Sequence, residues 1–231
     1  MKIKFLILEG LKKFFLSFIF MGIYAILLPK FPMDLMGEPE FVIKYPYLYQ
    51  RLIFLLITGP LVRSRYYCGW LLSTSTLAFN GIAYGETEKD GKIIPNTDKG
   101  SYGSILIYEI GMHPKLKMIY WNMSIHLWLK YNVYTRLLST KGIFKNNKTL
   151  SILFTYIISA FWHGFYSSYY LGFFMVFLFE QCSFFMDYIG FYEYVDDKPY
   201  LWPLVSLKTM IFNNSMSTTF FLLEYKNALQ I

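Results

Sequence analysis

A single histidine lies in the middle of a long apolar stretch of this chain. Leu150 to Phe179 is almost wholly apolar or aromatic, and His163 is near its centre. A helix needs roughly 20 apolar residues to cross a bilayer, so this stretch predicts one span, or two segments that break near His163 and Gly164. An ionisable side chain at that depth is costly, and an imidazole titrates near neutral pH. His163 is therefore a candidate functional residue, with a histidine that only bonds a neighbouring helix as the alternative.

A second stretch, Met112 to Leu138, carries polar residues at a spacing of four. Asn122, His126 and Lys130 fall on one face of a helix. Apolar and aromatic positions share another face: Trp121, Ile125, Trp128 and Leu129. The pattern predicts an amphipathic helix at the membrane interface, with its tryptophans at headgroup level. A helix that serves only as an anchor is the simpler interpretation.

The composition indicates what kind of protein must position these residues. Of 231 residues, 55% are hydrophobic and 21% aromatic, and only 16% are charged, against about 25% in soluble domains. Because lipid-facing backbone must be hydrogen-bonded internally, such a chain is expected to be helical. We predict an all-α, multi-pass membrane helical bundle with an amphipathic interfacial helix, forming a single domain over residues 1–231.

The charge pattern favours a membrane surface over nucleic acid as the partner of the basic residues. The formal net charge is +7, and many basic residues flank apolar runs: Lys12, Lys13, Arg63, Arg65, Lys145 and Lys148. Anchoring to anionic headgroups explains this placement, so no nucleic-acid partner is predicted. The two cysteines, Cys68 and Cys182, give neither a disulfide framework nor a metal-ligand spacing. We therefore predict no metal site.

Further apolar runs and loops complete the expected organisation. Apolar runs are expected at Phe14–Leu28, Leu52–Val62, Tyr66–Tyr84 and Leu201–Leu223. Loops are expected at Phe31–Pro46, from its prolines, and at Gly85–Gly103, the most polar part of the chain.

Two segments together resemble a known family. The asparagine motif, Trp121 to Leu137, is WNMSIHLWLKYNVYTRL, and the histidine motif, Ser159 to Phe173, is SAFWHGFYSSYYLGF. They resemble the membrane-bound O-acyltransferase family, more closely its lysophospholipid acyltransferase branch. The likeness rests on Trp121-Asn122, Trp128-Leu129, Tyr134, Arg136, Trp162-His163-Gly164 and Tyr169-Tyr170, and extends to RYYCGW and FNGIAYG upstream. The 41-residue spacing from Asn122 to His163 is also close to that of the family.

The chain departs from the branch in two ways. Ser167-Ser168 stands where the branch often has Pro-Gly. The chain is also expected to correspond to the C-terminal portion of the family fold, as a truncated isoform, a fragment or a divergent short member. The sequence therefore leaves open whether this chain is active by itself.

The resemblance implies a chemistry and a set of site residues. It makes His163 the general base that deprotonates an attacking hydroxyl. It makes Asn122 the donor that stabilises charge on the thioester oxygen, or the group that orients the histidine or the acyl chain. Acyl-CoA would be a co-substrate, with no bound cofactor and no metal. Substrate-binding residues implied are Trp121, Trp128, Lys130, Arg136, Trp162, Tyr169 and Tyr170. Lys130 and Arg136 would meet CoA phosphates or headgroups, or serve as interface anchors.

The leading hypothesis is an acyl-CoA-dependent lysophospholipid O-acyltransferase in the endoplasmic reticulum membrane. Its partners would be acyl-CoA, a lysophospholipid and membrane lipids, with the oligomeric state left open. One alternative is another acceptor, such as a sterol, diacylglycerol or a protein. The other is a truncated, non-catalytic membrane protein.

Overall fold

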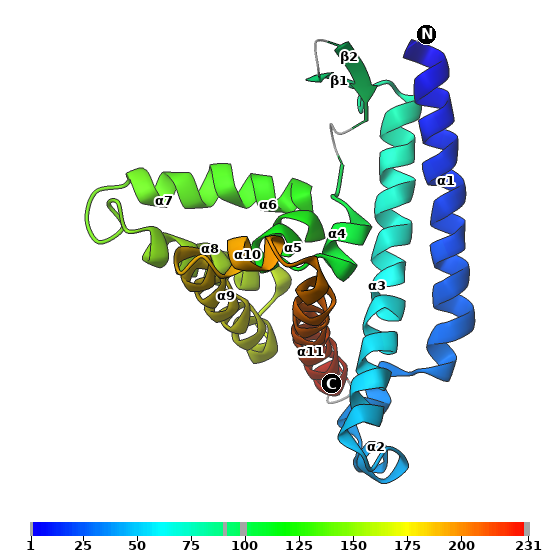
Figure 1. The fold of residues 1–231 in the computed structure, drawn as a ribbon, viewed down its shortest axis with the longest axis vertical. Helices are drawn as coiled ribbons and strands as arrows, with labels where there is room; N and C mark the ends of the chain where they lie inside the picture. The colour runs from blue at the N-terminus through cyan, green and yellow to red at the C-terminus, as the bar shows by residue number, and fades with distance from the viewer. Residues whose placement is uncertain (1, 90–91, 98–100, 229–231) are drawn as a thin grey trace.

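Two long helices lie side by side at one edge of the molecule (Figure 1). The computed structural model describes residues 2–89, 92–97 and 101–228. The two helices are α1 (Lys2–Leu27) and α3 (Leu48–Phe79). They run antiparallel and are joined by two 3₁₀ turns and a short helix: η1 (Leu28–Lys30), η2 (Met33–Gly37) and α2 (Pro39–Lys44). The expectation of a loop over 31–46 is therefore wrong for most of that segment.

Helix α1 packs closely on α3 through small and aromatic side chains. The hydroxyl of Ser75 donates to the carbonyl of Gly10 over 2.8 Å, and the ring of Phe79 covers the same glycine. Phe20 meets Tyr67 edge-on, with 5.4 Å between ring centroids. The apolar run predicted from Phe14 thus extends back to Lys2. Helix α1 with η1, and α9 described below, are long and apolar enough to cross a membrane.

Helix α3 joins two apolar runs that the sequence predicts as separate. It continues through Pro60 and Arg63 for 32 residues, about 48 Å at the usual rise. The hydroxyl of Ser64 donates to the carbonyl of Pro60 over 3.0 Å. Arg63 and Ser64 are both buried, so these polar residues pack inside the protein instead of forming a boundary between spans.

The polar segment Gly85–Gly103, expected to be a loop, contains a β-hairpin. Strands β1 (Gly85–Lys89) and β2 (Lys92–Asn96) pair antiparallel, with Gly85 opposite Asn96. Lys2 forms an ion pair with Glu86 at 2.8 Å, and Lys13 donates to the hydroxyl of Thr97 over 2.7 Å. Both contacts tie this segment to α1.

The predicted amphipathic helix over Met112–Leu138 is divided. The structure has α4 (Ile105–Ile110), α5 (Pro114–Trp121), α6 (Met123–Leu129), the π-helical turn η3 (Lys130–Tyr134) and α7 (Thr135–Ser139). The chain breaks at Asn122, between α5 and α6. Residues 123–139 then form one nearly straight rod, called the arm below, which lies across the direction of α3 and extends away from it (Figure 1).

The histidine-bearing stretch breaks where the sequence allows two segments. Helix α8 (Lys148–His163) ends at Gly164, which has φ of +135°, and α9 (Ser167–Tyr188) follows. A residue with a Cβ rarely adopts that φ, so glycine suits this turn. The remaining elements are α10 (Phe191–Asp196), η4 (Pro199–Leu201) and α11 (Trp202–Ala228). Helix α11 packs between α3 and α9.

Gly59 is required where α3 and α11 cross. A Cβ added to Gly59 would lie 2.3 Å from Oδ1 of Asn214, a side chain only 1% exposed. We expect Gly59→Ala to lower the free energy of unfolding by about 1–3 kcal/mol, because the overpacked crossing must shift. The matched control is Gly69→Ala, in the same helix with nothing within 4 Å of the new Cβ. It should be neutral or slightly stabilising. Thermal unfolding in detergent measures both, and equal midpoints would contradict this account.

Candidate active site

His163 is held at the end of α8 by rings from two other helices. Its imidazole lies 5.5 Å from the ring of Tyr169 and 5.3 Å from that of Phe173, both in α9. The ring of Phe220, in α11, is 6.0 Å away. The residue nevertheless stays exposed. An imidazole placed this way has its ring supported on one side and is accessible to a substrate on another.

Asn122 has a definite local role as the N-cap of α6. Its Oδ1 accepts from the backbone N–H of Ile125 at 3.4 Å, and its carbonyl accepts from His126 at 2.8 Å. Asparagine is among the preferred N-cap residues because its side-chain oxygen satisfies a free N–H at the helix start. The cap directs the oxygen of the carboxamide to the helix, so its NH₂ group faces away from that N–H.

Trp121 is packed among aromatic rings of α3 and α4. Its ring centroid is 4.7 Å from that of Tyr108, 4.9 Å from Trp70 and 5.7 Å from Tyr66. Trp70 in turn stacks on Tyr102, whose carbonyl accepts from the N–H of Met123 at 3.0 Å. The residues on both sides of Asn122 are therefore fixed, Trp121 against α3 and α4 and Met123 against the segment that precedes α4.

Helix α11 contacts the histidine motif directly and the asparagine motif through one intermediate ring. Tyr66, which contacts Trp121, lies 6.1 Å from the ring of Phe221. The preceding residue, Phe220, contacts His163. Successive residues of α11 thus connect to the asparagine motif through Tyr66 and to the histidine motif directly.

The other predicted residues of the histidine motif lie around His163. Tyr169 is buried against its ring, and Trp162 is 66% exposed, with its ring 5.8 Å from the imidazole. Tyr170 lines an apolar cavity of about 320 Å³ between α8 and α9. The cavity is lined by Leu153, Tyr156, Ile157, Tyr170, Phe173 and Phe174. Phe173 lines this cavity and also contacts His163, so its ring connects the two.

Three predicted substrate-binding residues lie elsewhere, along the arm. The side chains of Trp128, Lys130 and Arg136 are exposed, instead of packed among the rings around Trp121. Lys130 lies 5.5 Å from the centroid of the Tyr131 ring. A role in substrate binding stays a prediction for these three residues.

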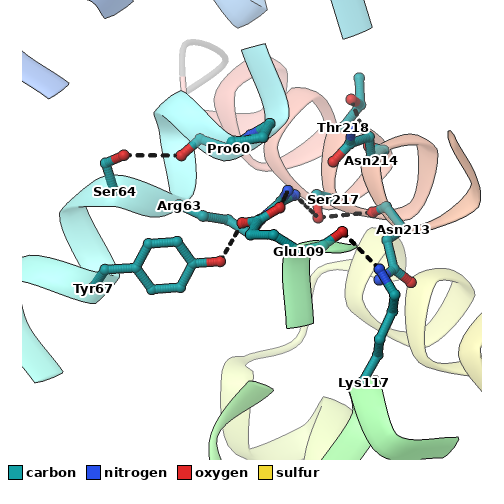
Figure 2. A network of polar contacts seen from close by, with 10 residues as sticks. All are labelled: Pro60, Arg63, Ser64, Tyr67, Glu109, Lys117, Asn213, Asn214, Ser217 and Thr218. Carbon is teal, nitrogen blue, oxygen red and sulfur yellow. Dashed lines mark hydrogen bonds and ion pairs between the residues drawn. The ribbon is translucent and has the colours of Figure 1, made fainter. Parts of the chain in front are cut away.

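A buried ion pair, which the sequence does not reveal, holds this region together (Figure 2). Arg63, 1% exposed, donates to both carboxylate oxygens of Glu109, at 2.5 and 2.8 Å. The hydroxyl of Tyr67 donates to the same carboxylate. Arg63 also donates to Ser217 of α11 at 3.3 Å, and Lys117 donates to the backbone carbonyl of Glu109 at 2.8 Å. The interpretation of Arg63 as a headgroup anchor is therefore wrong.

The ion pair also positions the ring cluster around Trp121. Tyr108 precedes Glu109, and its ring lies 5.4 Å from the guanidinium of Arg63 and 4.7 Å from the ring of Trp121. One clue was present in the sequence. Glu109 is the only acidic residue between Asp98 and Glu180, and an isolated charge among apolar residues is expected to have a buried partner.

Lys117 gives a pH-dependent prediction. Burial lowers the pKa of its ammonium to about 8, from 10.5. Between these two values the unfolded chain binds more protons than the folded protein, so stability should rise with pH across this window. We expect the melting temperature to increase by a few degrees from pH 8 to pH 10, and this increase to be smaller in Lys117→Met. Differential scanning fluorimetry of both proteins tests this, and identical pH profiles would contradict it.

Comparisons with known proteins agree with the motifs. The family model for the membrane-bound O-acyltransferase family matches residues 4–221. The "Lysophospholipid acyltransferase" of Saccharomyces cerevisiae is 34% identical over 134 residues, 58% of this chain and 21% of that protein. "Lysophospholipid acyltransferase 1" of Arabidopsis thaliana is 28% identical over 158 residues, 66% of this chain and 32% of that protein. The Schizosaccharomyces pombe "Lysophospholipid acyltransferase" is 30% identical over 62% of this chain and 27% of that protein. The chain thus spans between about a fifth and a third of the length of these relatives.

Proposed function

Because the chain belongs to the membrane-bound O-acyltransferase family, we propose that it transfers an acyl group from acyl-CoA to the hydroxyl of a lysophospholipid. The observation that supports this most is that one segment of α11 contacts the histidine motif directly and the asparagine motif through Tyr66. The names of the relatives favour a lysophospholipid as the acceptor. We further propose that it works in the endoplasmic reticulum membrane as a multi-pass protein.

In the proposed reaction His163 acts as the general base. A neutral imidazole nitrogen removes the proton of the lysolipid hydroxyl as its oxygen attacks the thioester carbon. The carbon–sulfur bond then breaks, the sulfur takes up the proton and leaves as CoA thiol, and the lipid keeps the new ester. The exposed position of His163, with its ring supported by Tyr169 and Phe173, suits this role.

Asn122 is proposed to stabilise the charge that develops on the thioester oxygen. A preorganised donor of this kind contributes about 3–4 kcal/mol in a dry site. The N-cap contact leaves the carboxamide with its oxygen at α6, which is the orientation that presents the NH₂ group as a donor. Positioning of the histidine or of the acyl chain is the alternative role for Asn122.

The apolar cavity lined by Phe173, whose ring also contacts His163, is proposed to receive part of an acyl chain. Its walls are aromatic and aliphatic side chains of α8 and α9. Burial of each methylene group in such a cavity contributes about 0.8 kcal/mol. A chain held there would bring its carbonyl end toward the imidazole.

The proposal is tested by an acyl-transfer assay on the 231-residue chain, purified in detergent and supplied with labelled acyl-CoA. Lysophospholipids with different headgroups are offered beside cholesterol, diacylglycerol and an acceptor peptide. Labelled phospholipid that appears only with a lysolipid acceptor would support the proposal. A labelled sterol, triacylglycerol or peptide would favour the first alternative. No transfer to any acceptor, by protein that unfolds cooperatively, would favour the non-catalytic alternative.

A further inference from the structure

The net charge of this protein is concentrated in one segment. Residues 110–179 contain seven Lys and Arg residues and no Asp or Glu. The rest of the chain contains 15 basic and 15 acidic residues. This segment therefore accounts for the whole net charge of +7. Such a long segment without one acidic residue indicates an anionic partner.

Most of these cations are displayed on the outside of the arm and of the loop that follows it. Lys117 is buried, and the other six are exposed: Lys115, Lys130, Arg136, Lys141, Lys145 and Lys148. Lys130 and Arg136 belong to the arm, and Lys141 and Lys145 belong to the loop that leads to α8. Their positive charges are therefore accessible to a partner that binds this part of the surface.

Large apolar side chains are exposed among the same cations. Trp128 is 55% exposed and Tyr131 60%, both on the arm, and Ile143, in the loop, is 72% exposed. A surface that faces only water would gain nothing from these side chains. Tryptophan, tyrosine and lysine together are typical of a segment at headgroup level, where rings enter the interface and ammonium groups meet phosphates.

We propose that the arm and its following loop, residues 123–148, form a docking surface for the headgroups of anionic lipids. The arm lies across the direction of α1 (Figure 1), a helix long enough to cross a membrane. A rod placed in this way can lie in the plane of a membrane that α1 crosses. The attraction acts over about 10 Å at 0.1 M salt, so it should weaken as the salt concentration rises. This inference does not depend on the proposed acyl transfer.

The test measures which lipids stay with the protein. The full chain is reconstituted in nanodiscs of phosphatidylcholine with about 20% phosphatidylserine, without CoA, and extracted gently, and the bound lipids are counted by native mass spectrometry. We expect phosphatidylserine to be enriched about twofold or more over its share of the bilayer. The variant Lys130→Gln/Arg136→Gln/Lys141→Gln/Lys145→Gln should lose at least half of this enrichment.

The matched control removes the same number of charges from exposed positions elsewhere: Lys4→Gln/Lys30→Gln/Lys44→Gln/Lys92→Gln. Both variants lower the net charge from +7 to +3, so only the place of the charges differs. The control should keep most of the enrichment. Equal enrichment in the two variants would overturn the proposal, and so would displacement of the bound lipid by added CoA, since the cations would then serve a soluble anion. If the first variant does not fold, the unmodified protein still decides, because enrichment unchanged at 0.5 M salt would also overturn the proposal.

Discussion

His163→Gln is expected to reduce acyl transfer by about 10² to 10⁴-fold, the usual contribution of a general base. Glutamine keeps a polar side chain of similar length but cannot accept the proton of the attacking hydroxyl. The ring neighbours of His163 come from α9 and α11, so the helices should keep their packing when the imidazole is replaced. The effect should therefore appear in kcat, with little change in the melting temperature.

The matched control for this prediction is His113→Gln. His113 lies at the start of α5, with its ring 4.5 Å from that of Tyr192 and its Nε2 3.9 Å from Asp196. His113 thus contacts a ring and a carboxylate outside the two motifs. Its replacement should leave the rate of acyl transfer within about twofold of that of the unmodified protein. Transfer by His163→Gln at the rate of the unmodified protein would show that the imidazole is not the base. A common loss in both variants would indicate a structural effect.

The second large effect is expected from the buried ion pair. Glu109→Ala leaves the guanidinium of Arg63, 1% exposed, without its carboxylate partner. Removal of one member of a buried pair costs about 3–5 kcal/mol, because the remaining charge stays desolvated. Tyr67 loses its acceptor in the same variant. We expect a much lower melting temperature in detergent, with loss of the packing between α3, α4 and α11.

An exposed ion pair in the same protein serves as the comparison. Lys2 and Glu86 lie 2.8 Å apart, with 67% and 39% of their side chains exposed. Lys2→Ala should leave the melting temperature close to that of the unmodified protein, since solvent screens such a pair. The double variant Arg63→Leu/Glu109→Leu should be less destabilised than Glu109→Ala, because it buries no unpaired charge. A Glu109→Ala protein as stable as Lys2→Ala would refute the structural role of the buried network.

Features that depend on neighbouring residues in the chain could be predicted from the sequence. The break at Gly164 is one example, because the only information needed is local: a glycine after a histidine inside an apolar run. The last helix is another, since the predicted run from Leu201 becomes most of α11. The family resemblance of the two motifs is confirmed by the match over residues 4–221.

Features that depend on distant residues could not be predicted. Arg63 and Glu109 are separated by 46 positions. In the sequence, Arg63 and Arg65 together follow an apolar run, which is the pattern of basic residues that flank a membrane helix. The approach of Phe220 to His163 depends on how α11 crosses α9, which no local pattern determines. Asn122 shows a third limit. Its spacing to His126 and Lys130 predicts one continuous face, yet its preference for an N-cap interrupts the helix there.

The π-helical turn Lys130–Tyr134 has a consequence for the two halves of the arm. Such a turn contains one more residue than an α-turn, and each helical residue advances the direction of its side chain by about 100°. Every side chain of α7 is therefore rotated by that amount from where an uninterrupted helix would direct it. The stripe of polar residues at every fourth position consists of Asn122, His126 and Lys130 and ends there. Helix α7 directs a different set of side chains toward the start of α8. Deletion of one residue from this turn would therefore leave a continuous α-helix, with Arg136 and the rest of α7 directed as they are now.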